Sequence, residues 1–122
     1  MSTMRAVRVD SCGGPEQMSI REVPRPEPGP GEVRICLSAC GINLIDTYHR
    51  SGLYPLALPT GLGCEGAGRV DAIGDGVDDL NVGERVGFAM AMGAYAEAIV
   101  LPRSALVKIP DAVTDEEAAA VL

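Results

Sequence analysis

Apolar and polar residues alternate with a period of two in several short stretches of the chain, which is the pattern of half-buried β-strands. The clearest stretch is 32–40, where every second residue from Val33 to Ala39 is apolar. Further strands are predicted at 4–10, 17–23, 68–73, 85–89, 95–101 and 106–109. Many short strands separated by turns predict a mainly β fold with short helices, built as a barrel or a sandwich.

Glycine and proline mark the connections between these strands. Residues 11–16 contain a Gly-Gly-Pro run, which predicts an N-terminal hairpin from the first two strands. Residues 24–31 contain four prolines, so we expect an extended surface connection without sheet hydrogen bonds. Turns are also predicted at 74–76 and 81–83.

One helix is predicted with a clear start. Thr114 and Glu117 have the spacing of a capping box, and the alanine-rich residues 118–122 continue with helix formers. No C-terminal cap follows, so we expect the sequence to stop within a helix that begins near residue 114. A shorter helical turn is expected after Gly41, where Asn43 and Asp46 have side chains that favour caps.

Length and charge narrow the class of protein. The 122 residues fit one domain of ordinary size. Ten basic and 17 acidic residues give a net charge of -7, which makes nucleic acid an unfavourable partner. No apolar run approaches the roughly 20 residues of a transmembrane helix, and the N-terminus lacks the core of a signal peptide. We therefore expect a cytoplasmic protein without a membrane partner.

The cysteines show no spacing that is typical of a metal knuckle or a redox pair. They are Cys12, Cys36, Cys40 and Cys64. Free thiols are the favoured interpretation. The alternative is a metal site that combines Cys64 with Cys40, His49 and Glu65.

Several motifs together resemble a known family. They are Pro-Gly-Pro-Gly-Glu-Val at 28–33, Gly-Ile-Asn-Leu-Ile-Asp-Thr-Tyr-His-Arg-Ser-Gly-Leu-Tyr at 41–54, the glycine-rich stretch 59–77 and Gly-Glu-Arg-Val at 83–86. This sequence resembles the N-terminal, GroES-like half of medium-chain dehydrogenases, and within them the zinc-free quinone oxidoreductases. The resemblance implies that residues 1–122 form a GroES-like catalytic domain with a partly open β-barrel. It also implies a Rossmann domain that this sequence lacks.

The same resemblance bears on metal and cofactor. Zinc-dependent alcohol dehydrogenases carry a zinc-ligating cysteine and histidine at positions that hold Asn43 and Cys64 here, so the resemblance implies no zinc. A zinc alcohol dehydrogenase fragment is kept as a weaker alternative. The glycines of 63–68 are spaced G-x-x-G-x-G, which is not the dinucleotide fingerprint. Most contacts to NADPH are therefore expected from the Rossmann domain.

Without a metal, hydrogen-bond donors must polarise a substrate carbonyl. The candidates in the motif are the Asn43 amide and the hydroxyls of Thr47, Tyr48 and Tyr54. From the residues alone, Asn43 and Asp46 suit a helix cap as well as a cofactor contact, and the two tyrosines suit core packing as well as a cleft.

The resemblance favours the functional roles. It implies that Asn43, Ile45, Asp46, Thr47 and Tyr48 contact the nicotinamide half of NADPH. It implies that Tyr48 and Tyr54 line the quinone cleft, with Asn43, Tyr48 and Tyr54 as the catalytic residues.

Two further residues invite a role. His49 is the sole histidine and a candidate general acid, although a surface position is the favoured interpretation. The resemblance implies that Glu65 has a supporting role beneath the active site. If it is buried, its carboxylate needs a partner such as Arg69 or Arg50.

The resemblance implies the catalytic-domain portion of an NADPH-dependent quinone or enone oxidoreductase that transfers hydride without zinc. The isolated chain is expected to be inactive, and the full-length protein is expected to be a homodimer. The alternative is a stand-alone GroES-like binding or assembly module without redox activity, because a fold alone does not establish catalysis.

Overall fold

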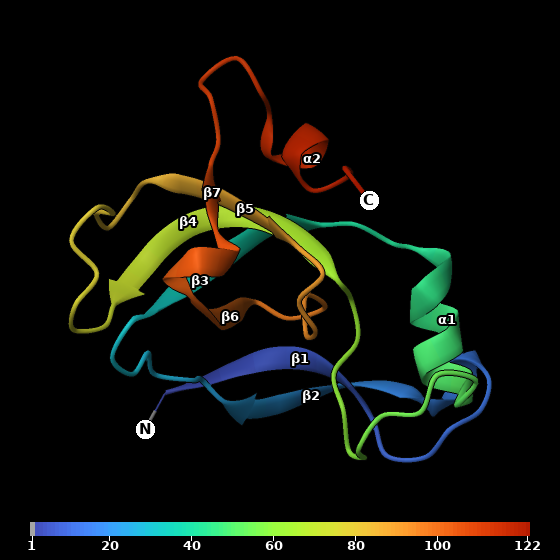
Figure 1. The fold of residues 1–122 in the computed structure, drawn as a ribbon. Helices are drawn as coiled ribbons and strands as arrows, with labels where there is room; N and C mark the ends of the chain where they lie inside the picture. The colour runs from blue at the N-terminus through green and yellow to red at the C-terminus, as the bar shows by residue number, and fades with distance from the viewer. Residues whose placement is uncertain (1) are drawn as a thin grey trace.

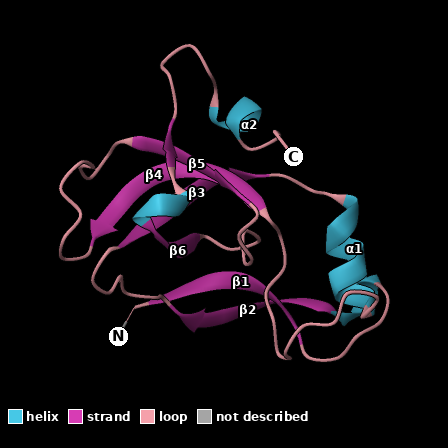
Figure 2. Ribbon diagram, viewed as in Figure 1, coloured by secondary structure: helices cyan, strands magenta, loops and turns pink. Residues whose placement is uncertain are grey.

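Residues 2–122, which the computed structural model describes, form two antiparallel sheets, two α-helices and two short 3-10 turns (Figure 1, Figure 2). Strands β1 (Thr3–Val9) and β2 (Met18–Pro24) pair as a hairpin. The second sheet has the order β6-β3-β4-β5-β7. Its strands are β3 (Glu32–Cys40), β4 (Glu65–Ile73), β5 (Arg85–Ala89), β6 (Ala98–Pro102) and β7 (Val107–Lys108). The helices are α1 (Leu44–Ser51) and α2 (Asp115–Ala118), and the 3-10 turns are Pro15–Gln17 and Arg103–Ala105.

The main hydrophobic core lies on one face of the five-stranded sheet. The alternation predicted in β3 is confirmed there, since Val33 and Ile35 are fully buried whereas Cys36, on the other face, is exposed. The other buried members are Val70, Leu80, Val86, Phe88, Ala94, Ile99, Leu101 and Leu106. Burial of these apolar side chains provides the main stabilisation of the fold.

The β1–β2 hairpin lies beneath the larger sheet in Figure 1. It is joined to the rest of the chain by isolated bridges, one between Ala6 and Ala96 and one between Val9 and Thr60. Met4 and Ala6 pack against Ala98 in a second, smaller core. The hairpin is therefore held both by backbone hydrogen bonds and by apolar contacts.

The prediction of a mainly β fold with short helices is confirmed. In the described part of the chain, the two sheets are open and do not close into a barrel, which agrees with the predicted partly open barrel. All strand pairs among residues 2–122 are antiparallel, and this part of the chain contains no doubly wound parallel sheet. The proline-rich segment after β2 forms neither helix nor strand, as predicted.

Two strands begin three residues away from their predicted starts, whereas the other strand boundaries differ by at most one residue. β4 begins at Glu65 and not at residue 68, because Glu65 and Gly66 already pair with β5. β6 begins at Ala98 and not at residue 95, because the preceding residues bond to β1: Val7 N–H donates to Tyr95 O. Alternation alone does not show which neighbour a stretch pairs with.

The two helices also differ in length from the predictions. The helical turn expected after Gly41 is a helix of eight residues. It is capped at its C-terminus by Gly52, whose φ of 89° is readily adopted by glycine. The Thr114 capping box is confirmed, but α2 ends at Ala118. The predicted continuation of this helix to Leu122 is therefore wrong. The N–H groups of Val121 and Leu122 donate to the Glu65 side chain and not to carbonyl groups of a preceding turn.

None of the helices in residues 2–122 is long and apolar enough to cross a membrane.

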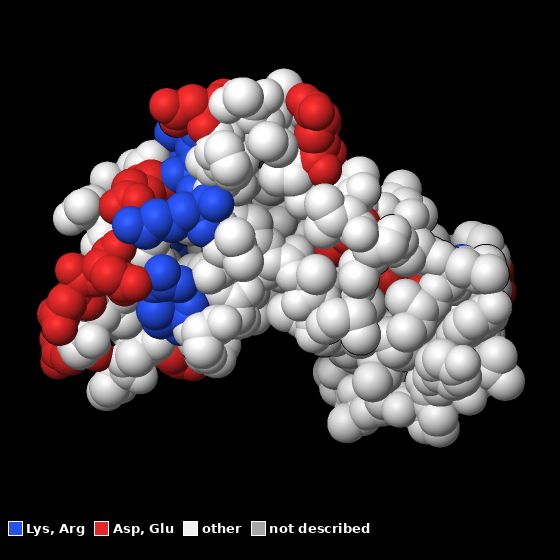
Figure 3. Space-filling view, turned by 45° about the horizontal axis from the view of Figure 1, so that its top comes forward, with Lys and Arg blue, Asp and Glu red and all other residues white. Residues whose placement is uncertain are grey.

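Charged side chains are unevenly distributed over the surface. In Figure 3, basic and acidic side chains lie side by side on one flank, whereas the flank that carries α1 is largely uncharged. Ion pairs such as Arg103–Asp79 and Arg34–Asp71 bring basic and acidic side chains together. Ile42, Leu44 and Leu53, in or beside α1, expose most of their surface. An apolar surface is thus available next to the predicted site.

Candidate functional site

The predicted site is centred on the first turn of α1. The chain leaves β3 at Cys40, passes Gly41 and enters the helix through Asn43, the N-cap residue. The N–H of Asn43 donates to Oδ2 of Asp46 at 3.0 Å, which confirms the predicted capping role of Asp46. The side chain of Asn43 extends the other way, and its Nδ2 donates to Oε1 of Glu65 at 3.1 Å. Asn43 therefore connects α1 with β4.

Glu65 is a buried carboxylate, only 2% exposed. Besides the Asn43 amide it accepts hydrogen bonds from the N–H groups of Val121 at 3.2 Å and Leu122 at 2.8 Å, both on Oε2. Hydrogen bonds of this kind stabilise a carboxylate away from water. Glu65 thus joins β4, the start of α1 and the C-terminal segment.

The prediction that Arg69 or Arg50 pairs with Glu65 is wrong. The Arg69 guanidinium donates to the carbonyl of Gly83 at 2.9 Å, and that of Arg50 donates to Gly13 at 3.2 Å. Both side chains are directed to turns. The amide and main-chain donors occupy the positions around Glu65 that an arginine would need.

Asp46 is a second buried carboxylate, 5% exposed. Its Oδ2 accepts a hydrogen bond from the Tyr95 hydroxyl at 2.5 Å and another from the Asn43 N–H. Its Oδ1 is buried without a partner among the described residues. Burial, and then the hydrogen bond to Asp46, raise the pKa of Tyr95, so its hydroxyl stays protonated as a donor. Sequence reasoning missed Tyr95 because nothing in its local pattern marks it.

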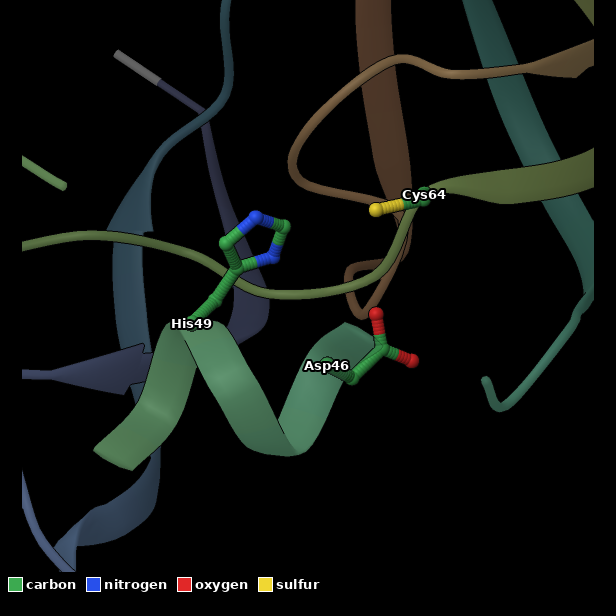
Figure 4. Close-up of side chains that lie close together, drawn as sticks. All are labelled: Asp46, His49 and Cys64. Atoms are coloured by element: carbon green, nitrogen blue, oxygen red, sulfur yellow. The ribbon is translucent and has the colours of Figure 1, made fainter. Parts of the chain in front are cut away.

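Three side chains with metal-ligating atoms meet on the inner side of α1 (Figure 4). The ligand atoms of Asp46, His49 and Cys64 all lie within 4.8 Å of one another. Burial, and then the charge of Asp46, raise the pKa of the Cys64 thiol.

His49 is not the surface residue that was expected. It is half-buried, and its Nδ1 is enclosed without a hydrogen-bond partner among the described residues. The alternative metal set of the sequence analysis is only partly brought together. Glu65 is directed to Asn43 and the C-terminal N–H groups, and Cys40 is exposed. None of the four cysteines in residues 2–122 forms a disulfide.

The two tyrosines of the motif lie together. The rings of Tyr48 and Tyr54 are 5.2 Å apart between centroids and inclined at 64°, an edge-to-face pair. His49 meets Tyr54 in the same manner at 6.3 Å. Neither tyrosine belongs to the hydrophobic core, and Tyr54 is half exposed. The core-packing alternative for these tyrosines is therefore wrong.

A hollow of about 190 Å³ lies beside the first turn of α1. It is lined by Asn43, Asp46 and Thr47 together with Met18, Ile42, Arg50, Leu62 and Tyr95. Ile45 and Tyr48, the other predicted cofactor contacts, lie on α1 outside this lining. The Thr47 hydroxyl donates to the Leu44 carbonyl at 2.6 Å, so its proton is not free to polarise a substrate.

Fold and comparison together define the class of protein, a GroES-like domain of the alcohol dehydrogenases. The family model "Alcohol dehydrogenase GroES-like domain" matches residues 29–111, and the chain belongs to this family. The chain is 48% identical over 120 residues to a quinone oxidoreductase of Pseudomonas aeruginosa, covering 97% of this chain and 37% of that protein. The predicted resemblance to quinone oxidoreductases is thereby confirmed.

Solved structures show the same likeness. A quinone oxidoreductase of Escherichia coli complexed with NADPH matches with a TM-score of 0.93 and 39% identity, over 97% of this chain and 37% of that one. A human synaptic vesicle membrane protein VAT-1 homolog-like protein matches with a TM-score of 0.94 and 37% identity, over 97% and 39%. The chain thus spans 37–39% of the length of these relatives.

Proposed function

We propose that this chain is the substrate-side domain of an NADPH-dependent quinone or enone oxidoreductase that transfers hydride without zinc. The observation that supports this most directly is the likeness to a quinone oxidoreductase complexed with NADPH, over nearly the whole chain. The hollow beside the first turn of α1 supplies a site of matching chemistry, because polar groups and an exposed apolar surface meet there.

The cofactor side of the site is assigned to Asn43, Ile45, Thr47 and Tyr48. When bound, NADPH supplies a hydride, that is, two electrons and one proton. Asn43 uses one N–H on Glu65, which leaves its Oδ1 and its second N–H for the carboxamide of a nicotinamide. Asp46 borders the same hollow, but its Oδ2 already accepts hydrogen bonds from Tyr95 and Asn43. We therefore propose that Asp46 positions these two residues.

The substrate side is assigned to the aromatic pair. Tyr48 and Tyr54 offer flat apolar surface to a quinone ring, and the exposed Ile42 and Leu53 extend it. A phenolic hydroxyl donated to the carbonyl oxygen of the substrate stabilises the negative charge that hydride addition leaves there. A proton from solvent then completes the reduced product.

The residues do not fit the zinc site of the alcohol dehydrogenases. Asn43, at the position of a zinc-ligating cysteine, directs its amide nitrogen to Glu65, and a protonated amide nitrogen is not a ligand. Polarisation of the substrate by hydrogen bonds is therefore proposed in place of a metal. The inactivity of the isolated chain, the homodimer and the cytoplasmic location stay predictions.

The experiment is a titration of the ¹⁵N-labelled chain with NADPH, followed by backbone NMR at millimolar cofactor. We expect shifts confined to the first turn of α1 and the segment near Tyr54, and their loss in Asn43→Ala. Arg103→Ala, on the distant charged flank, is the matched control and leaves the shifts unchanged. Shifts elsewhere contradict the proposal and favour a module without redox activity, whereas no shifts at all would mean that this site needs a Rossmann domain to bind NADPH.

A further inference from the structure

The Asp46, His49 and Cys64 side chains come from two segments and point into a common space (Figure 4). Asp46 and His49 are three residues apart on α1, so they lie on the same side of the helix. Cys64 comes from the segment that leads into β4. Their ligand atoms lie within 4.8 Å of one another, although Cys64 is 15 residues beyond His49 in the sequence.

Two of these side chains have buried atoms with unused hydrogen-bonding capacity. Oδ1 of Asp46 and Nδ1 of His49 are enclosed and have no partner among the described residues. Such atoms are rare in folded proteins, because leaving them unpaired away from water is unfavourable. Asp46 is 5% exposed and Cys64 is 6% exposed, so water has little access to the cluster.

We propose that Asp46, His49 and Cys64 form a binding site for a thiophilic divalent cation, with Zn²⁺ as the best fit. Carboxylate, imidazole and thiolate are the three ligand types that proteins use for zinc. A thiolate argues against Mg²⁺ and Ca²⁺, which take oxygen ligands.

The dimensions of the cluster suit a small cation. Zinc bonds of about 2.0–2.3 Å at tetrahedral angles place ligand atoms about 3.5 Å apart. Because the ligand atoms lie within 4.8 Å of one another, the side chains must close by at most about 1.3 Å. Three protein ligands leave the fourth position for water.

The cation would tie α1 to the segment before β4, beneath the surface assigned to the substrate. The ordinary alternative is a buried polar cluster in which the Cys64 thiol donates to Asp46 and no cation enters. The proposed hydride transfer uses no metal, so the cation site and the oxidoreductase proposal can fail independently.

The experiment is a titration of the reduced, metal-free 122-residue chain with Co²⁺, which occupies zinc sites and reports thiolate ligation by a near-ultraviolet charge-transfer band. We expect one equivalent to bind, with that band and the intense visible bands of a tetrahedral site. Zn²⁺ should displace Co²⁺ stoichiometrically.

Two variants locate the ligands. Cys64→Ser removes the charge-transfer band, and His49→Gln weakens binding by more than about tenfold, since even outer partners of a metal site are worth 10–100-fold. Cys36→Ser removes an exposed thiol on β3 and serves as the matched control, with unchanged binding. Circular dichroism of each metal-free variant shows that it is folded.

A second readout is the melting temperature, which a ligand of the folded state raises. Zn²⁺ is expected to stabilise the wild-type chain and Cys36→Ser, but neither Cys64→Ser nor His49→Gln. The proposal is overturned if the folded chain takes up no Co²⁺, or if Cys64→Ser or His49→Gln binds as tightly as the wild type. It is equally overturned if Cys36→Ser abolishes binding.

Discussion

The hydroxyl of Tyr95 lies 2.5 Å from Oδ2 of Asp46 and joins two segments that are 49 residues apart in the sequence. The same carboxylate oxygen accepts the N–H of Asn43 at the start of α1. The orientation of the helix that carries the candidate site is therefore linked to the segment that pairs with β1. The Tyr95–Asp46 hydrogen bond thus relates the arrangement of the sheets to the position of Asn43.

Tyr95→Phe is expected to destabilise the chain by about 1.5–3 kcal/mol, because a hydrogen bond to a charged, buried acceptor is lost. The free energy of unfolding from urea titration measures this. Tyr48→Phe is the matched control, since its hydroxyl makes no hydrogen bond within residues 2–122. We expect a change below about 0.5 kcal/mol for Tyr48→Phe. Equal losses in the two variants would show that the Tyr95–Asp46 contact contributes little.

Gly41→Ala is expected to destabilise the chain by about 1–3 kcal/mol, because the added Cβ has no space. It would collide with Oε1 of Glu65 and lie 2.5 Å from the backbone oxygen of Ala119. Gly87→Ala, where the nearest atom is 3.6 Å away, is the control and should cost less than about 1 kcal/mol. Thermal and urea unfolding of both variants measure the difference, and a harmless Gly41→Ala would disprove the close approach.

The contacts of Asp115 with Ser38 and Arg85, which anchor the start of α2, are expected to weaken in acid. The Ser38 hydroxyl, and then the Arg85 guanidinium, lower the pKa of Asp115 below its usual value of 3.8. Because the folded state binds this proton less tightly than the unfolded state, the stabilisation is present above about pH 4 and is lost as the pH falls through the lowered pKa.

Asp115→Asn tests this anchor, since the amide cannot form the ion pair. The wild type should be more stable than the variant at pH 6, and the difference should shrink as the pH is lowered towards 3. Urea titrations across this range measure the difference. A difference that is independent of pH would mean that the charge of Asp115 has no part in anchoring α2.

The four thiols are expected to react at different rates. Cys12 and Cys36 are exposed, whereas Cys64 is buried and has a raised pKa, so it holds less of the reactive thiolate. Limited alkylation with iodoacetamide at pH 8, followed by peptide mass spectrometry, should label Cys12 and Cys36 at least about tenfold faster than Cys64. The same measurement in denaturant is the control, where the rates converge. Fast labelling of Cys64 in the folded chain would contradict its enclosed position.

The sequence by itself determined the local elements. The alternation through Val33 and Ile35 predicted β3, because the side chains of a strand point to opposite faces in turn. The Thr114–Glu117 spacing predicted the start of α2, because a capping box needs only four consecutive residues. The motif from Gly41 to Tyr54 located the helix and the paired tyrosines of the candidate site.

Only the tertiary structure decided which groups those elements bring together. The partners of Glu65 come from residues 22 to 57 positions away, and Tyr95 reaches Asp46 from a different segment. His49 lies near Cys64 because α1 is close to the segment that leads into β4, which no local pattern reports. Contacts between distant segments depend on strand pairing and packing. Sequence periodicity indicates only the type of helix or strand to which a residue itself belongs.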